Sequence, residues 1–182
     1  MVANDELTIT YGDLRLQIRT IINDVYKKDR QCKSPNDILL KSVQMDIIRA
    51  YHKFALMRMR IGILWERIFC LFGYDKLPKG GDIINHDKKV IIELKNAKSS
   101  DNKSSRTEDT RKLIQYGQPG YQLIYGVIND KKSKDENMVY EGTTYRLLTG
   151  PLLLEFILGD KWQDIIKIIQ NEFNASVGVK FT

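Results

Sequence analysis

Cysteine and histidine are scarce in this sequence, with only 2 of each among 182 residues. Cys32 and Cys70 lie far apart and form no C-x-x-C pair. A disulfide framework or a cysteine-based zinc site needs more cysteines than this, and sites built on two or three imidazoles lack the ligands. We therefore expect any chemistry of this chain to depend on carboxylates and lysines.

Long apolar runs are also missing, and no stretch reaches the roughly 18 apolar residues of a membrane span. The first residues include Asp5 and Glu6 and lack the basic and then apolar pattern of a signal peptide. Repeats, low-complexity tracts and linkers rich in proline or glycine are not found either. We expect a cytoplasmic protein of one domain, without membrane contact and long enough to bury a core.

The charge balance is moderately basic, with 29 Lys and Arg against 23 Asp and Glu and a net charge of +6. A basic excess fits a polyanionic partner, although solvated helix faces explain each local cluster equally well. Charge alone therefore does not decide the function.

The pattern of apolar residues predicts an α/β fold, a mixed β-sheet flanked by helices. We divide the chain into N-terminal helices (1–60), a core (61–128), and a C-terminal strand and helices (129–182). Helices are expected at 14–26, from Ser34 onward, and at 61–73, 108–116, 151–158 and from 162. Strands are expected at 82–85, 90–95 and 121–128, with a final one near 138–140 or 145–148.

The two predicted strands at 82–85 and 90–95 form a hairpin candidate, because a polar turn separates them. A turn centred between Asp87 and Lys88 places Asp82 opposite Glu93. Directly opposed side chains have Cβ atoms roughly 4.5–5.5 Å apart. Two ionised carboxylates at that distance repel each other unless a cation lies between them or one of them keeps its proton. A divalent ion that prefers oxygen ligands, such as Mg²⁺, satisfies this need.

Lys95 belongs to the same group, since side chains alternate along a strand and Lys95 shares a face with Glu93. A metal held by two carboxylates beside an ammonium suits phosphodiester hydrolysis, in which water attacks a phosphate and negative charge develops. Gly80 and Gly81 leave the backbone bare next to Asp82, so that a phosphate can approach closely.

A structural explanation competes with this one, in which Asp82 is a turn residue and Glu93 and Lys95 are exposed strand charges. The flanking segments 83–84 and 90–92 are apolar on both faces, as in strands that are covered on both sides. Unpaired charges in such strands cost several kcal/mol, which favours a functional site.

The sequence Gly81-Asp82, ten further residues, then Glu93-Leu94-Lys95 resembles the motif of the PD-(D/E)XK nucleases. In element order the resemblance covers Gly62 to Tyr125, with Gly81 in the place of the family's proline. It implies that Asp82, Glu93 and the backbone carbonyl of Leu94 bind Mg²⁺ and that Lys95 is the catalytic lysine. Glu66, an acid on the preceding helix, would bind a second metal or its water. Mn²⁺ is expected to substitute for Mg²⁺, and Ca²⁺ is expected to support DNA binding without cleavage.

Within that superfamily the chain looks most like a small type II restriction endonuclease. This implies a single nuclease domain that cuts double-stranded DNA at specific sequences, as a homodimer and without a nucleotide cofactor. Two polar segments, 96–116 and 129–141, would contact DNA unless they are simply solvated. The residues expected to bind DNA are Asn96, Lys98, Ser99, Lys103, Arg106 and Arg111.

Other functions stay open at this point. A junction resolvase or repair nuclease would keep the chemistry and change the substrate. A DNA-binding module would have no enzymatic role, and a metal-bound structural protein would keep the carboxylates without catalysis. The segment from His86 to Lys88 also looks like the histidine-lysine-aspartate signature of phospholipase-D-type nucleases. We do not favour that interpretation, because the later acid is Glu93 and a nucleophilic histidine needs a buried, oriented setting.

Overall fold

The computed structural model describes residues 11–29, 45–97 and 103–177, and every structural statement below concerns these residues. The chain divides into two compact units. The first includes Glu66–Ile165, and the second includes Thr10–Trp65 and Ile166–Thr182. Each unit is described by itself, and the assignment of all residues to one nuclease domain stays a prediction.

The first unit is built on a six-stranded sheet in the order β1-β2-β3-β4-β6-β5. The pairs β3/β4 and β4/β6 are parallel and the other neighbouring pairs are antiparallel. The predicted class, α/β with a mixed sheet flanked by helices, is therefore confirmed. The strands are β1 (Asp75–Lys76), β2 (Ile83–Asn85), β3 (Val90–Ala97), β4 (Gln122–Asn129), β5 (Asp135–Tyr140) and β6 (Thr143–Thr149).

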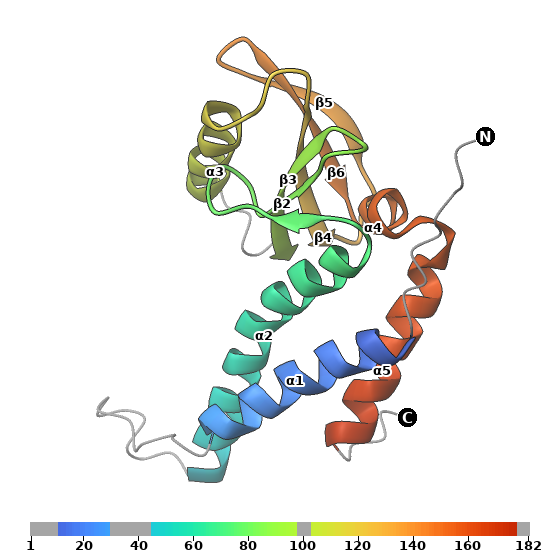
Figure 1. Ribbon diagram of the computed structural model, residues 1–182. Coiled ribbons are helices and arrows are strands. Elements are labelled where there is room, and N and C mark those ends of the chain that lie inside the picture. Colours follow the sequence, from blue (N-terminus) through green and yellow to red (C-terminus); the bar gives the residue numbers. More distant parts are fainter. Residues whose placement is uncertain (1–10, 30–44, 98–102, 178–182) are drawn as a thin grey trace, which may run out of the picture. The chain divides into compact units, whose positions relative to one another are not determined.

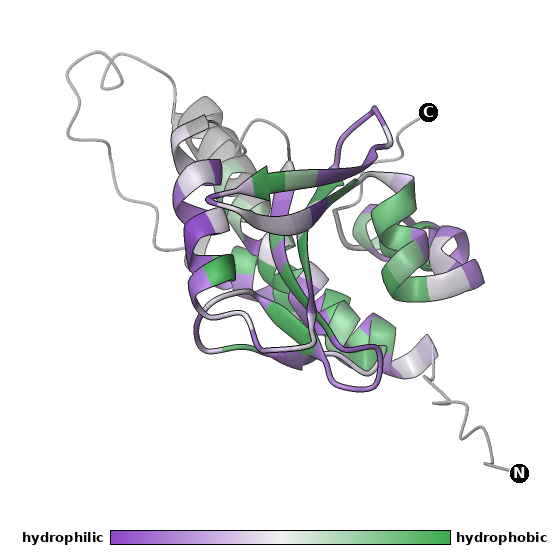
Figure 2. Ribbon diagram, turned by 90° about the horizontal axis from the view of Figure 1, so that it is seen from above, coloured by the Kyte–Doolittle hydropathy of each residue, from purple (hydrophilic) through white to green (hydrophobic). Residues whose placement is uncertain are grey.

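Two helices cover opposite faces of this sheet, α3 (Lys103–Gln115) and α4 (Pro151–Leu158) (Figure 1). On one face Leu113 of α3 belongs to the same buried cluster as Ile91 and Tyr125. On the other face Leu153 of α4 packs on Gly126, where an added Cβ would lie 2.9 Å from the leucine side chain. The helix α4 is mostly hydrophobic and α3 mostly hydrophilic (Figure 2). The charged groups of α3 therefore lie on the first of these two faces.

The β2/β3 hairpin has the predicted register. Ile84 pairs with Ile91, and Asn85 pairs with Val90. The turn between the strands is stabilised by Asn85, whose Oδ1 accepts a hydrogen bond from the Lys88 backbone N (2.7 Å). Asn85 is almost fully buried and also donates to the carbonyl of Gly73 (2.8 Å). Both contacts hold the hairpin in the register on which the site depends.

Several elements are longer than the sequence indicated. The strand β3 continues to Ala97 and α3 begins at Lys103, so the polar loop expected over 96–107 is shorter. Pairing of Ala97 with Asn129 extends the strand, and Asn129 Nδ2 donates to Asn96 Oδ1 (2.9 Å). Both candidate segments for the final strand are strands, β5 and β6, joined by a turn with positive φ at Glu141 (48°) and Gly142 (79°).

The described part of the second unit is helical and includes α1 (Tyr11–Asp29). Two further helices, α2 (Met45–Leu71) and α5 (Trp162–Val177), contribute to both units. Glu172 of α5 is nearly buried and forms ion pairs with two arginines of α1. Its Oε1 lies 3.2 Å from Nε of Arg15, and its Oε2 lies 2.9 Å from Nε of Arg19. The helix predicted to begin at Ser34 has its start outside the described residues. Within the described residues, every helix is too short or too polar to cross a lipid bilayer.

Candidate active site

A pocket of about 500 Å³ lies beside the β2/β3 hairpin, entirely within the first unit. The loop before β2 and the helix α3 form its walls. Three carboxylates reach it, from Asp82, Glu93 and Asp109, and two cations of α3, Arg111 and Lys112, line the other part. The pocket thus combines buried negative charge with a positive rim.

Asp82 lies directly before β2 and is held to β3 by both backbone and side chain. Its backbone N donates to the carbonyl of Ile92 (2.9 Å), and its Oδ2 accepts a hydrogen bond from the backbone N of Leu94 (2.7 Å). Burial raises the pKa of Asp82, the bond from Leu94 opposes this, and the charge of Glu66 raises the pKa further. The Asp82 carboxylate is therefore fixed in place, but its surroundings do not fully stabilise its negative charge.

Glu93 lines the same pocket as Asp82, as the hairpin register predicts. Its side chain is only 13% exposed. Burial, and next the charge of Asp82, raise the pKa of Glu93 to about 7, although Lys95 acts in the opposite direction. A cation bound next to a carboxyl group with this pKa would strongly stabilise its ionised form.

Lys95 joins the carboxylates through two ion pairs. Its Nζ lies 3.0 Å from Oε1 of Glu93 and 2.8 Å from Oδ2 of Asp109 on α3. Burial lowers the pKa of Lys95, but the contacts with Asp109 and Glu93 outweigh burial and leave the pKa above its ordinary value. Lys95 is therefore a cation at neutral pH.

Asp109 is a residue of the candidate site that sequence reasoning missed. It precedes the fully buried Leu113 by four residues, so both lie on the face of α3 that meets the sheet. The sequence signal for Asp109 was its position one helical turn before an apolar residue that packs on the sheet. The predicted helix began one residue before Asp109, yet nothing in the sequence indicated which strand this face would contact.

Glu66 of α2 lies close enough for its charge to raise the pKa of Asp82. Its Oε2 accepts a hydrogen bond from Lys76 Nζ on β1 (2.6 Å), and this contact raises the pKa of Lys76. The strand β1 was not predicted, and so neither was this partner. A role of Glu66 in binding a second metal stays a prediction.

The residues expected to bind DNA are only partly brought together. Arg111 lines the pocket, whereas Arg106 lies over the ring of Tyr125, with 5.7 Å between its Cζ and the ring centroid. Asn96 is hydrogen-bonded to Asn129. Lys98 and Ser99 lie outside the described residues, and the structure describes only the backbone of Lys103.

The donor set fits a magnesium ion, although no group of three Asp, Glu, His or Cys side chains among the described residues forms a ready metal cage. Asp82, Glu93 and the carbonyl of Leu94 would supply hard oxygen ligands, which Mg²⁺ prefers. The raised pKa of Glu93 supports this fit, because a bound cation would offset both causes of the shift.

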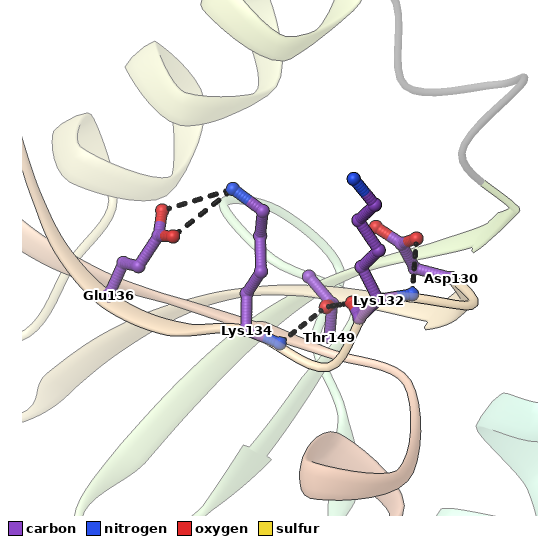
Figure 3. Close-up of polar contacts among 5 residues, drawn as sticks. All are labelled: Asp130, Lys132, Lys134, Glu136 and Thr149. Carbon is purple, nitrogen blue, oxygen red and sulfur yellow. Dashed lines mark hydrogen bonds and ion pairs between the residues drawn. The ribbon is translucent and has the colours of Figure 1, made fainter.

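A second lysine–glutamate pair lies in the same unit, where the β4–β5 loop joins β5 (Figure 3). Lys134 Nζ lies 3.1 Å from Oε1 of Glu136. The loop is held by Thr149, whose Oγ1 donates to the carbonyl of Lys132 (2.6 Å) and accepts from the backbone N of Lys134 (3.0 Å). Asp130 adds a further bond within the loop, accepting from the backbone N of Lys132 (3.0 Å).

Comparison with known proteins gives no match, either among protein-family models or among curated sequences. The geometry of the site is therefore the basis for assigning a function.

Proposed function

We propose that this protein is a metal-dependent endonuclease that hydrolyses phosphodiester bonds of double-stranded DNA. The observation that carries this proposal is the shared pocket of Asp82 and Glu93, with the ammonium of Lys95 in contact with Glu93. Two carboxylates in one solvent-accessible pocket, with a lysine in contact with one of them, form an arrangement suited to metal-assisted phosphodiester hydrolysis.

Asp82, Glu93 and the Leu94 carbonyl would hold Mg²⁺ in this proposal. When bound, the ion would polarise the phosphate and lower the pKa of a water molecule. Mn²⁺ should substitute, and Ca²⁺ should support binding without cleavage. The hydrogen bond from Leu94 N orients one oxygen of Asp82 and leaves its other carboxylate oxygen for the ion.

Lys95 would orient the attacking water and stabilise the negative charge that develops on the phosphate. An ammonium has three N–H donors, and two acids, Glu93 and Asp109, contact this one. One donor thus remains for water or a phosphate oxygen. The raised pKa keeps the lysine charged, which favours an electrostatic role over that of a general base.

The positive rim supports a phosphate-containing substrate. Arg111 and Lys112 extend from α3 into the pocket that contains the acids. Gly80 and Gly81 line it with bare backbone, and cations beside such a surface attract nucleic-acid phosphates. We further propose a type II restriction enzyme that acts as a homodimer in the cytoplasm, with symmetric DNA sites shared between two copies.

The test is cleavage of supercoiled plasmid DNA by the purified chain. We expect cleavage with Mg²⁺ and none in EDTA. Asp82→Asn and Glu93→Gln should retain their circular dichroism spectra and lose cleavage. His86→Ala is the control, since His86 lies in the exposed hairpin turn and contacts Tyr121 OH (2.8 Å). Full activity of Glu93→Gln would refute the proposed mechanism.

The form of the products separates the candidate substrates. Discrete fragments from linear duplex DNA support a restriction enzyme. Cutting confined to branched DNA instead indicates a junction resolvase or repair nuclease, and binding without cutting under all metal conditions indicates a DNA-binding module.

A further inference from the structure

The ammonium of Lys95 is held from two different elements of the fold. Glu93 is its neighbour on β3, and Asp109 reaches it from α3. All three side chains are largely shielded from solvent, with exposed fractions of 13% for Glu93, 16% for Asp109 and 19% for Lys95. Such shielding strengthens the electrostatic interaction of each carboxylate with the lysine.

Glu93 and Asp109 differ in their other surroundings. Glu93 lines the same pocket as Asp82 and would share its oxygens with a bound cation, which would weaken its interaction with Lys95. Asp109 belongs to a helix whose next turn is anchored in the sheet by the fully buried Leu113. Asp109 can therefore retain the lysine when Glu93 is engaged.

We propose that Asp109 is a positioning residue that holds the Lys95 ammonium beside the Asp82/Glu93 pair. This inference rests on the proposed nuclease function. Asp109 acts through Lys95 and is not itself a metal ligand in this proposal. Without Asp109, Glu93 is the remaining acidic partner of Lys95. The Lys95 ammonium and the metal ion then compete for the same oxygens of Glu93.

The experiment compares Asp109→Asn with Glu108→Gln. Glu108 is the preceding residue on α3, and its side chain is 61% exposed and pairs with Lys112. Both variants remove one negative charge from adjacent positions, but only Asp109→Asn removes a partner of Lys95. We expect Asp109→Asn to lower kcat by about 10–100-fold, the usual effect of losing a residue that orients a catalytic group.

The KM of Asp109→Asn for DNA should stay within about threefold of the wild-type value, since the substrate contacts remain. A merely structural ion pair would change thermal stability without this selective loss of kcat. Glu108→Gln should keep kcat near that of the wild type, because Glu108 does not contact Lys95.

A second readout does not depend on turnover. Calorimetry of Ca²⁺ binding should show several-fold weaker affinity for Asp109→Asn than for Glu108→Gln, because Lys95 then rests on Glu93 alone. If Asp109→Asn does not fold by circular dichroism, Asp109→Ser provides the same comparison with a smaller polar side chain.

The outcomes separate the two proposals. Wild-type cleavage together with equal kcat and Ca²⁺ affinity for Asp109→Asn and Glu108→Gln would overturn the positioning role alone. A wild-type chain that neither cuts DNA nor binds Ca²⁺ would overturn the nuclease proposal and the positioning role with it.

Discussion

Two lysine–glutamate pairs of the first unit have the same spacing in sequence and nearly the same geometry. The Nζ–Oε1 distance is 3.0 Å for Lys95 and Glu93 and 3.1 Å for Lys134 and Glu136. Their exposures differ, because the side chains are 19% and 13% exposed in the first pair and 39% and 47% exposed in the second. Distance alone therefore does not distinguish a candidate active site from a surface ion pair.

The surroundings make the difference. Lys95 also contacts Asp109, and Glu93 lies beside Asp82 in a pocket, so that two further acids act on the first pair. The second pair lies where the β4–β5 loop joins β5, next to the contacts that Thr149 Oγ1 makes with the loop backbone, and its side chains are much more exposed to solvent (Figure 3). Water screens such an exposed pair and reduces its contribution. Burial and additional carboxylates, and not the two-residue spacing, distinguish the first pair from the surface pair.

The largest expected difference is in DNA cleavage. Lys95→Met should lower kcat by about 10²–10³-fold, the effect typical of removing one group that stabilises developing charge. Lys134→Met removes the same charge from the exposed pair and should cleave as the wild type does. Plasmid cleavage at saturating Mg²⁺ measures both, and equal losses in the two variants would remove the distinction between the pairs.

The next difference concerns a glycine of the pocket and a glycine of the exposed β5/β6 turn. Gly80 (φ 81°) forms the wall of the pocket, and an added Cβ would lie 2.0 Å from Tyr116 Cβ. Gly142 (φ 79°) lies in the β5/β6 turn and has no atom within 4 Å of an added Cβ. Gly80→Ala should cost about 2–4 kcal/mol, from strain and overpacking together.

Gly142→Ala should cost only the strain of the positive φ, about 1–2 kcal/mol. Urea unfolding of the two variants gives both values. A Gly80→Ala variant no less stable than Gly142→Ala would show that the loop before Asp82 can move away from α3.

The pH dependence of stability should distinguish the two glutamates. The folded-state pKa of Glu93 is raised from 4.5 to about 7. The folded chain thus holds this proton more tightly than the unfolded chain, and the resulting stability is complete at low pH and is lost as pH rises through 7. Between about pH 5 and about pH 8 in EDTA, the wild type should lose on the order of 1–3 kcal/mol relative to Glu93→Gln.

Glu136→Gln is the control for this measurement, and the pH dependence of the wild type should persist in it. Chemical unfolding across the pH range gives the free energies. Parallel curves for the wild type and Glu93→Gln would contradict the raised pKa.

The smallest expected effect is on the stability of the exposed pair. Removing its charge by Lys134→Met should change the free energy of unfolding by about 1 kcal/mol or less, as is usual for solvent-exposed ion pairs. A larger loss, measured by urea unfolding, would mean that the side chain also fixes the loop that Thr149 holds.

The hairpin and its charges could be predicted because they depend on neighbouring residues. Apolar β-branched segments on both sides of a short polar turn determine strands, turn and register together. This placed Ile84 opposite Ile91 and Asn85 opposite Val90, as the structure has them. The pocket shared by Asp82 and Glu93 agrees with the same register.

Contacts between elements distant in sequence could not be predicted in this way. The short strand β1 has only two residues and little pattern of its own, and it exists through pairing with β2. The Lys76–Glu66 contact depends on that pairing. The Lys95–Asp109 contact likewise requires α3 to cross the face of β3, which is set by the packing of Leu113.

The sequence by itself determined which residues oppose each other across the hairpin, because strands joined by a short turn have few possible registers. Only the tertiary structure decided which charged residues from other elements reach the site. Asp109 contacts Lys95, and Lys76 contacts Glu66. The physical reason is that helix packing is selected by apolar burial summed over many contacts. The positions of the charged side chains then follow from this packing.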